Sequence, residues 1–360
     1  MGKGKKYRWL FVVLALASVV CACVQAVQNQ AVVKIDPYFL IGSSETRENL
    51  QDLFILLERE DSGSPEQFAV IREIANTYAG LREYDRLIHF LGSHTADEHS
   101  NPYSSYYLFM TAYAYQQLKA DPIAARYFDL IVRNYPDLSI NGNSIHLACL
   151  NRLIELTGRP ERQVWYYREL ISRFPDNIDP GVTWFKLGRA YEQAGEWSSA
   201  IQAYTRYLAY PGTVIPGFPN ADNYAKQQVD FSKSPKDWTF ESLSALRRAV
   251  QWALDEGSPA DLRQCQAQVN FFARSWEQAE TDDSGMADFN LADFMRGNNR
   301  IRYAERLDIA SNATEAYLRT SGWSQYISTW YLYFRKIYFP SDPEIHGRWE
   351  WAGVYYGEKF

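Results

Sequence analysis

The sequence contains few cysteines and lacks the short motifs that mark the common catalytic and nucleotide-binding sites. Four cysteines among 360 residues are too few for a disulfide framework. Cys149 and Cys265 lie in helical patterns and are expected to be buried free thiols, with a single bridge between them as the alternative. There is no H-E-x-x-H, P-loop, G-x-S-x-G or glycine-rich dinucleotide turn. The sequence therefore predicts a protein that is not an enzyme, with no catalytic residues and no cofactor.

No cluster of potential metal ligands has a suitable spacing either. The nearest candidates are three histidines and two acidic residues between positions 89 and 99. His89 and His94 are five residues apart, which places them on different faces of a helix, so we interpret this segment as a polar loop. Four aspartates between positions 282 and 293 depart from the order of an EF-hand loop and are interpreted as an exposed acidic linker. No metal site is predicted.

The hydrophobic run near the N-terminus is too short to span a bilayer. Four basic residues among the first eight precede an apolar stretch over residues 9–20, whereas a spanning helix needs about 20 apolar residues. A basic start, a short apolar run and a cleavage site of small residues are the parts of a secretory signal peptide. Residues 1–22 are therefore predicted to be a signal peptide that is removed on export.

The end of this run resembles a bacterial lipobox, in which a cysteine receives a diacylglyceryl group and becomes the first residue. Cys23 is the expected lipidation site because Ala22 is small enough for the peptidase, whereas Cys21 follows the bulkier Val20. Cleavage after Ala22 or Ala26 without lipidation is the alternative, and it gives a soluble exported protein. We expect the chain to be exported to the bacterial cell envelope, lipid-anchored and facing the periplasm.

Overall the chain has no excess of positive charge. Its formal net charge is −6, and loss of the four basic leader residues leaves 33 basic against 43 acidic residues, a balance of −10. An acidic protein of this kind is a poor partner for nucleic acid and for anionic membrane surfaces. If it lies on a membrane, a lipid anchor is expected to hold it there.

Aromatic residues are abundant at 16%, with 26 Tyr and 11 Trp, and some recur with a regular spacing. The pattern W-x2-L-G-x2-Y runs from Trp184 to Tyr191 without a gap, and Ala200, Tyr204 and Pro211 follow. These are positions of the tetratricopeptide (TPR) repeat, a pair of helices of about 34 residues, and the chain resembles this superfamily. The resemblance implies a helical solenoid that holds protein partners.

Each of these positions has a mechanical role in such a helix pair. Gly188 and Ala200 are small, so that the two helices can approach closely. Large side chains are expected to fill the space towards the next pair, and they are Trp184, Leu187, Tyr191 and Tyr204. Gly195 breaks the chain between the helices, and Pro211 closes the second helix because it lacks an N–H.

Three weaker copies precede this repeat, so that about four repeats are predicted, over residues 67–95, 103–136, 144–175 and 181–212. Their equivalent residues are spaced 37, 39 and 37 positions apart, and they are Tyr78, Tyr115, Ile154 and Tyr191. A helix over residues 46–60 with a broad apolar face would cap the stack. Together these elements predict a TPR domain over residues 44–212.

The pattern changes after Pro211. Residues 213–238 begin with proline- and glycine-rich loop sequence and are predicted to be a linker without a helix. Residues 239–360 are predicted to form a smaller helical C-terminal domain, with helices over residues 239–255, 259–280, 299–320 and 323–338. The aromatic tail over residues 348–356 is expected to be a short β-hairpin or an extended strap on those helices. The predicted fold class is therefore all-α.

The concave groove of the TPR stack is the predicted partner-binding surface. Helix positions that point away from the packing seam within each repeat would line it. The candidate partner-binding residues are Tyr106, Phe109, Met110, Tyr113, Arg152, Phe185, Lys186 and Arg189. Aromatic residues and arginine are enriched at binding hot spots, so a peptide with acidic and apolar groups would suit this groove. The aromatic stripe has an alternative interpretation, which is packing against a neighbouring helix or the C-terminal domain.

Export, predicted lipidation and repeats that end in an aromatic residue and a proline together resemble bacterial envelope TPR lipoproteins. One group of these helps to assemble outer-membrane β-barrels, and another partners substrate-binding proteins of TRAP-type transporters. The resemblance implies a non-enzymatic envelope scaffold that binds a protein or peptide. One alternative is a transport-associated lipoprotein that holds a small apolar ligand or partners a substrate-binding protein. A third is an outer-membrane assembly factor, or a cell-wall enzyme with a buried glutamate in a cleft.

Overall fold

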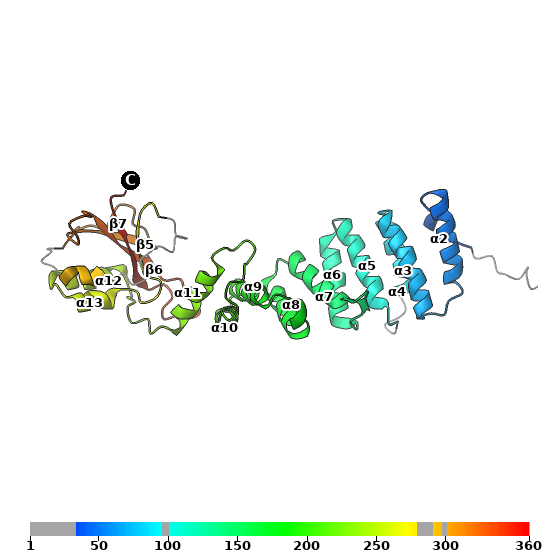
Figure 1. The fold of residues 1–360 in the computed structure, drawn as a ribbon, viewed down its shortest axis with the longest axis horizontal. Coiled ribbons are helices and arrows are strands. Elements are labelled where there is room, and N and C mark those ends of the chain that lie inside the picture. The colour runs from blue at the N-terminus through cyan, green and yellow to red at the C-terminus, as the bar shows by residue number, and fades with distance from the viewer. Residues whose placement is uncertain (1–33, 96–100, 279–290, 297–300, 360) are drawn as a thin grey trace, which may run out of the picture. The chain divides into compact units, whose positions relative to one another are not determined.

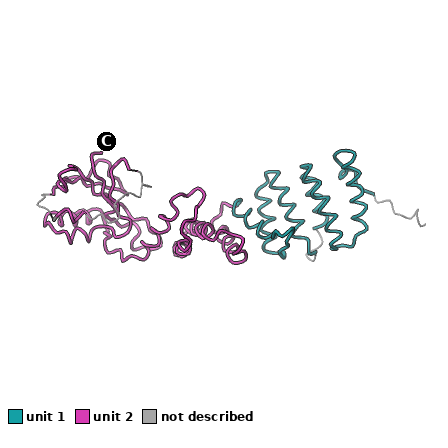
Figure 2. The backbone as a smooth tube through the Cα atoms, in the orientation of Figure 1, with its two compact units in different colours: residues 1–156 teal, residues 157–360 magenta. Residues whose placement is uncertain are grey.

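The computed structural model describes residues 34–95, 101–278, 291–296 and 301–359. The chain divides into two compact units, residues 1–156 and residues 157–360 (Figure 2). The boundary falls inside the third predicted repeat, and the predicted domain limits at residues 212 and 239 stay predictions. The signal peptide and Cys23 lie outside the described residues, as do residues 97–99 and 282–288. No helix within the described ranges is long and apolar enough to cross a membrane.

Unit 1 is a row of helices in which each helix packs against the next along the chain (Figure 1). Its elements are η1 (Pro37–Phe39), α2 (Ser44–Leu57), α3 (Pro65–Gly80), α4 (Tyr84–Thr95), α5 (Ser104–Gln117), α6 (Asp121–Asn134), the antiparallel hairpin of β1 (Ser139–Ile140) and β2 (Asn143–Ser144), and α7 (Ile145–Leu156). A helix is thus present at the position of the predicted cap. The helix pairs α3–α4 and α5–α6 correspond to the first two predicted repeats.

The turn between the two helices of a repeat has the same geometry in three places. Arg82, Lys119 and Gly195 have positive φ angles of 60°, 61° and 79°, and each lies four residues after an equivalent repeat tyrosine. In each turn the next amide N–H donates to that tyrosine's carbonyl, at 2.9, 2.9 and 2.8 Å. These are the hydrogen bonds of a Schellman motif, which ends a helix with a left-handed residue. The first, second and fourth predicted repeats therefore share one local structure.

Unit 2 begins with helices and ends with a sheet. Its helices are α8 (Pro160–Arg173), η2 (Pro175–Asn177), α9 (Pro180–Gln193), α10 (Trp197–Tyr207), α11 (Ala221–Lys233), α12 (Leu243–Asp255), α13 (Pro259–Cys265) and η3 (Leu291–Arg296). From α8 to α11 each helix packs against the next. The expectation that no helix lies in residues 213–238 is wrong. Ala221, Ala225 and Val229 give α11 an apolar face, which packs into a buried cluster with α9 and α10.

The fourth repeat shows why a glycine occupies the predicted contact between its two helices. A Cβ atom added at Gly188 of α9 would lie 2.5 Å from Cε1 of Tyr204 in α10, well inside van der Waals distance. Tyr204 and Ala200 are 0% and 1% exposed. The predicted role of Gly188, which is to allow the two helices to approach closely, is confirmed.

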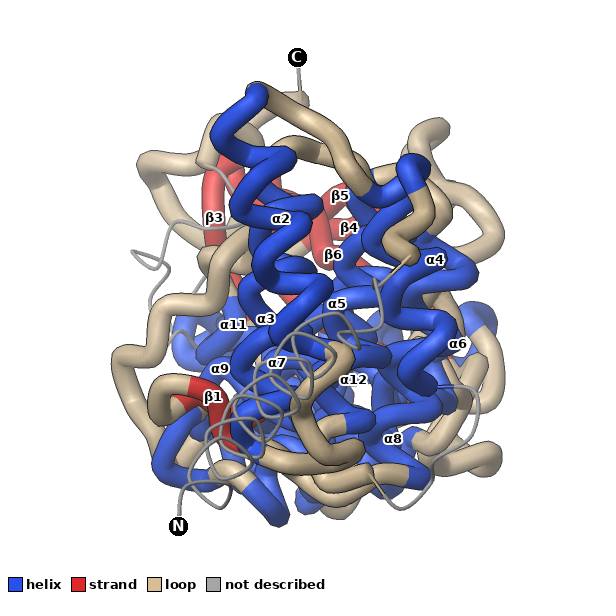
Figure 3. Tube along the Cα trace, turned by 90° about the vertical axis from the view of Figure 1, so that its right-hand side faces the viewer, coloured by secondary structure: helices blue, strands red, loops and turns tan. Residues whose placement is uncertain are grey.

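The all-α prediction is wrong for the C-terminal part, which contains a five-stranded sheet (Figure 1). The strands are β3 (Phe272–Ser275), β4 (Arg302–Tyr303), β5 (Glu315–Ser321), β6 (Trp330–Lys336) and β7 (Trp349–Tyr356). Their order is β3-β7-β6-β5-β4, with β3 parallel to β7 and the other neighbours antiparallel. The strands β3 to β6 lie where helices were predicted over residues 259–280, 299–320 and 323–338, although α13 does form at the start of the first of these ranges. Among the described residues, strands otherwise occur only in the β1–β2 hairpin (Figure 3).

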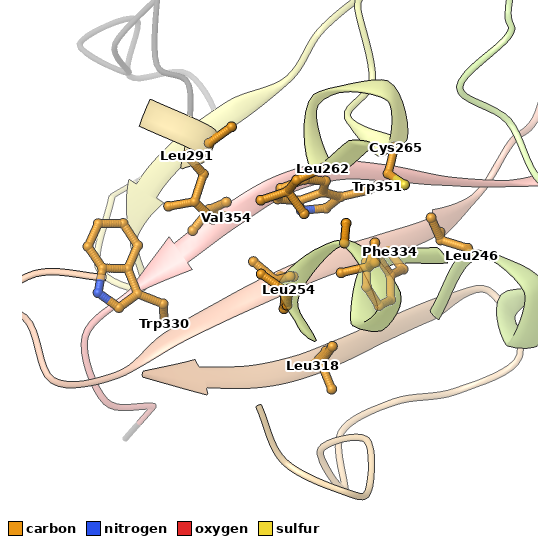
Figure 4. Packing of buried hydrophobic residues seen from close by; sticks show 14 of the residues in the cluster. Leu246, Leu254, Leu262, Cys265, Leu291, Leu318, Trp330, Phe334, Trp351 and Val354 are labelled. Atoms are coloured by element: carbon orange, nitrogen blue, oxygen red, sulfur yellow. The ribbon is translucent and has the colours of Figure 1, made fainter. Parts of the chain in front are cut away.

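α12, α13 and one face of this sheet enclose a buried core (Figure 4). Leu318 of β5 and Leu332 and Phe334 of β6 are 0% exposed and belong to it. The residues that alternate with these along β5 and β6 point to the opposite face of the sheet. β7 pairs with β3 on one side and β6 on the other, so the predicted hairpin or strap over residues 348–356 is instead an inner strand of the sheet. Cys149 and Cys265 are both buried free thiols, and the alternative of a bridge between them is not formed.

Candidate functional site

The predicted groove residues fall into two sets, one in each unit. Tyr106, Phe109, Met110 and Tyr113 lie on α5 and Arg152 lies on α7, all in unit 1. Phe185, Lys186 and Arg189 lie on α9 in unit 2.

Tyr106 belongs to the core of unit 1 rather than to an open surface. Its side chain is 6% exposed and meets the ring of Phe68 in α3 edge to face, with 5.2 Å between the ring centroids. Burial raises the pKa of the Tyr106 hydroxyl to about 12. A side chain buried to this extent offers little surface to a partner in the groove. The prediction for Tyr106 is therefore corrected to packing between neighbouring helices.

Phe109, Met110 and Tyr113 are half-buried. The ring of Phe109 lies 5.7 Å from that of Phe128 in α6, and the ring of Tyr113 lies 6.2 Å from that of Tyr84 in α4. These contacts fit the alternative interpretation, in which the aromatic stripe of α5 packs against its neighbours. A role for the remaining exposed part of the three side chains stays a prediction.

Arg152 and Lys186 are the exposed members of the predicted sets. Arg152 forms an ion pair with Glu155 at 3.0 Å, and both side chains are more than half exposed. Such an exposed pair contributes at most about 1 kcal/mol to stability, so Arg152 can change partner at little cost. Both residues are accessible, and their predicted roles stay predictions.

α11 covers Phe185 and Arg189. Phe185 is 1% exposed, and its ring lies 5.0 Å from that of Phe218 in the loop before α11. Arg189 donates a hydrogen bond to the hydroxyl of Tyr224 in α11 at 2.9 Å and forms an ion pair with the buried Glu192. The hydroxyl of Tyr224 donates to Glu192 at 2.7 Å. The prediction of both residues as free groove residues is corrected, because the unexpected helix α11 packs on this side of α9.

A different surface of the fourth repeat is open. α8, α9 and α10 surround a cavity of about 340 Å³, which we call the Trp184 pocket. Its lining residues are Arg168, Ile171 and Ser172 from α8, Trp184, Leu187 and Tyr191 from α9, and Ser199, Gln202, Ala203 and Arg206 from α10. The lining therefore combines two aromatic rings, aliphatic side chains and two guanidinium groups.

Trp184 and Tyr191 are half-buried, because each has two environments. On one side they pack against the buried cluster that α9, α10 and α11 share, and on the other side they line the pocket. The prediction that Trp184 fills space between helices is therefore incomplete. Part of each ring is available to a ligand.

The pocket is positively charged. Arg168 and Arg206 are exposed, and no acidic residue is among the lining residues. Within the described part of the chain neither arginine forms an ion pair. A guanidinium group binds a carboxylate through two parallel hydrogen bonds. The pocket can thus receive a carboxylate beside a large apolar side chain.

A second, polar cleft tests the enzyme alternative. It has a volume of about 210 Å³ and is lined by Glu350, which is 1% exposed. Both carboxylate oxygens of Glu350 are engaged, one with Nε of Arg335 at 2.8 Å and one with Nε1 of Trp238 at 2.9 Å. Glycoside hydrolysis uses two carboxyl groups, and the described lining of this cleft contains no second one. Through these two hydrogen bonds Glu350 ties β7 to β6 and to the segment before α12.

No group of three or more histidine, cysteine or acidic residues in the described ranges is arranged to hold a metal ion. Of the two segments considered from the sequence, Asp293 lies in η3, 3.4 Å from Arg263. His89 and His94 lie in α4, so the interpretation of their segment as a polar loop is wrong at these two residues. His89 meets the ring of Tyr38 edge to face at 6.0 Å. Helix packing and a surface ion pair account for these residues.

Part of the Trp184 pocket is recognisable in the sequence and part is not. Trp184 and Tyr191 belong to the repeat motif, and the motif assigns them to packing. Arg168 and Arg206 lie on the second helices of two consecutive repeats, α8 and α10. Nothing in the sequence around either residue marks the two as a pair. Only the packing of α8 against α9 brings them to one pocket.

The comparisons with known proteins agree with the helix pairs. The tetratricopeptide repeat family model matches residues 106–138 and 183–213. These segments contain most of α5 and α6 and most of α9 with all of α10. The comparison with curated proteins finds no match to this chain.

Proposed function

We propose that this protein, which contains tetratricopeptide repeats, is a non-enzymatic scaffold that binds a protein partner through the Trp184 pocket. The proposal is carried by the pocket's lining, in which Trp184 and Tyr191 lie beside Arg168 and Arg206. Tryptophan, tyrosine and arginine are the residues that dominate binding hot spots. A partner segment with a carboxylate next to a large apolar side chain would complement both parts of the lining.

The location that we propose is the bacterial cell envelope, with a lipid on Cys23 as the anchor. The support is the basic and apolar leader over residues 1–22 and the lipobox-like sequence at its end. Mass spectrometry of the mature protein tests this. We expect a chain that begins at Cys23 and carries a diacylglyceryl group. A chain that begins elsewhere, or that begins at Cys23 without lipid, would contradict the anchor.

Selection from a random peptide library on the purified protein tests the pocket. We expect the enriched peptides to combine acidic and aromatic or long aliphatic residues. They should bind an Arg168→Glu/Arg206→Glu variant at least about tenfold more weakly, because losing one partner of a charge pair that is buried and hydrogen-bonded in the complex costs about 2 kcal/mol or more. Arg162→Glu is the matched control, since Arg162 is also exposed on α8 but is not among the lining residues. Equal losses in the two variants would refute the pocket as the binding site.

The size of the pocket supports a second candidate function, the retention of a small apolar ligand in transport. Small-molecule sites have volumes of about 300–1,000 Å³, and the Trp184 pocket lies at the lower end of this range. Native mass spectrometry of the purified protein separates the two functions. A co-purified small molecule that Trp184→Ala removes would favour ligand retention over peptide binding.

A further inference from the structure

The face of the C-terminal sheet that points away from α12 and α13 is aromatic. Tyr317 of β5 is paired with Tyr333 of β6, and Tyr331 of β6 is paired with Tyr355 of β7. These tyrosines alternate along their strands with the residues of the buried core. Tyr317 and Tyr355 are only half-buried. The sheet thus offers ring surface on the side that the helices leave uncovered.

Trp276, the residue after β3, lies across this face. Its ring stacks on that of Tyr355, with 4.2 Å between centroids and an interplanar angle of 8°. It meets the rings of Tyr331 and Tyr317 at 5.3 and 5.6 Å. The indole N–H is buried and has no hydrogen-bond partner among the described residues. Ring contacts therefore position Trp276, and the ring of Tyr317 stands beside it at an angle of 47°.

An ammonium group occupies the angle between these two rings. Nζ of Lys359 lies 4.9 Å from the centroid of Trp276 and 4.7 Å from that of Tyr317, within the reach of about 6 Å for a cation–π interaction. Oδ1 of Asp308 lies 3.9 Å from the same nitrogen. Two aromatic walls with a nearby carboxylate form an arrangement that binds organic ammonium ions.

The segment that carries Lys359 is held by exposed polar contacts. The amide of Gly357 donates to the carbonyl of Thr329 at 3.0 Å, and Glu358 accepts hydrogen bonds from Thr329 at 2.5 Å and from Arg319 at 3.0 Å. The side chains of Arg319 and Glu358 are 53% and 54% exposed. Exposed ion pairs contribute little to stability. The Lys359 side chain can therefore leave its position without disturbing the buried core.

We propose that Trp276, Tyr317 and Asp308 form a binding site for a methylated ammonium group, and that Lys359 occupies this site until an external ligand displaces it. The site lies in the C-terminal sheet and is separate from the Trp184 pocket, so it adds a second binding activity to the scaffold. A quaternary ammonium has no N–H group, so it loses no N–H hydrogen bonds to water when it enters the site. It therefore suits a site that offers ring faces and one carboxylate but few hydrogen-bond acceptors.

Competition with Lys359 gives a quantitative expectation for the affinity of an external ammonium ion. A site that Lys359 fills about nine-tenths of the time binds an external cation about tenfold more weakly than the same site when it is empty. Lys359→Met keeps the apolar stem and removes the charge. This substitution is therefore expected to increase the affinity for an external ammonium by about tenfold.

The probe is tetramethylammonium chloride, titrated into the full chain against sodium chloride at equal ionic strength. The indole N–H signal of Trp276 in a nitrogen-15 NMR spectrum, identified by its loss in Trp276→Phe, reports binding. We expect a saturable shift, at about tenfold lower concentration in Lys359→Met than in the wild type. Asp308→Asn in the Lys359→Met background should weaken binding several-fold, because it removes one charge. It keeps the Oδ1 atom that accepts from the amide of Ala310 at 3.0 Å.

Two results would overturn the proposal. One is the absence of a saturable shift in Lys359→Met, and the other is an affinity that Tyr317→Leu and Asp308→Asn both leave unchanged. Choline and phosphatidylcholine vesicles then distinguish the source of the ammonium. Binding of free choline without binding to vesicles assigns the site to a soluble ligand, and binding to both assigns it to a lipid headgroup. Peptide binding at the Trp184 pocket should be the same in all these variants.

Discussion

Replacing Gly188 by alanine is expected to destabilise the fourth repeat, although alanine is the better helix former. The new methyl group would meet Cε1, Cδ1 and Cζ of Tyr204 at 2.5, 2.8 and 2.9 Å, whereas carbon atoms pack at about 3.5–4.0 Å. The ring cannot easily retreat, because Tyr204 is fully buried between Phe185 and Tyr224. Overpacking costs about 1–3 kcal/mol, and the helix propensity of alanine returns about 1 kcal/mol. The expected net loss in the free energy of unfolding is therefore up to about 2 kcal/mol.

Urea denaturation of the full chain, followed by circular dichroism, measures this loss. Gly80→Ala in α3 is the matched control, because a Cβ atom at Gly80 meets nothing within 4 Å. The free energy of unfolding of that variant is expected to rise by up to about 1 kcal/mol. Tyr204→Leu in the Gly188→Ala background should relieve the clash and give a coupling energy of at least about 0.5 kcal/mol in a double-mutant cycle. If Gly188→Ala stabilises the protein as Gly80→Ala does, the close packing of α9 on α10 is refuted.

Four further substitutions test the repeat turns, the sheet and the buried Tyr106. Arg82→Gly should raise the free energy of unfolding by up to about 1 kcal/mol, and Gly195→Ala should lower it by about as much, because a left-handed conformation costs a residue with a side chain about 1–2 kcal/mol. Thermal melting checks both changes. A less stable Arg82→Gly or a more stable Gly195→Ala would contradict the shared turn. Glu350→Gln should lower the free energy of unfolding, measured by urea denaturation, by about 2 kcal/mol, since it weakens charge-assisted hydrogen bonds from Arg335 and from the indole of Trp238. An unchanged midpoint would exclude that role. Burial raises the pKa of Tyr106 from 10.0 to about 12, so the stability it contributes is complete below pH 10 and falls as the pH rises towards 12. Tyr106→Phe should flatten this fall by about 2–3 kcal/mol in denaturation curves measured across that range, and an equally steep fall in the variant would contradict the assignment.

The repeat helices are predictable because the information that specifies them is local in the sequence. Each repeat turn needs only a tyrosine and, four residues later, a residue in the left-handed conformation, as at Tyr191 and Gly195. The clash that an alanine at Gly188 would cause likewise follows from a motif within one helix pair. A single segment of the chain therefore carries the evidence for its own structure, and the two segments that match the repeat family model are among those that show it.

The C-terminal sheet could not be predicted, because large side chains cover both of its faces. On β6, Leu332 and Phe334 enter the buried core while Tyr331 and Tyr333 point to the opposite face. All four are large and apolar or aromatic, so the alternation that marks a strand is hidden. The parallel pairing of β3 with β7 also joins residues about 80 positions apart, as Arg274 with Tyr355 shows. Such long-range pairing leaves no local pattern.

The candidate site was only partly predictable for a similar reason. The pattern identified Trp184 correctly as a repeat residue, but the choice of Phe185 and Arg189 as free groove residues failed. That choice assumed a loop after Pro211, whereas Ala221 and the residues that follow form α11, which covers this side of α9. The open pocket then lies on the other side, where α8 supplies Arg168. Which face of a repeat is free depends on its neighbours, and the repeat motif does not contain that information.

Charge exchange across the Trp184 pocket tests the scaffold proposal most directly. The measurement is the affinity of a peptide selected on the wild-type protein, and of its acidic-to-lysine variant, for the wild type and for Arg206→Glu. The account predicts that either change alone weakens binding by at least about tenfold, and that the two changes together restore a large part of the loss, because the same charge pair is remade with opposite signs. Losses that simply add, with no recovery in the double exchange, would contradict the claim that a partner's carboxylate enters this pocket.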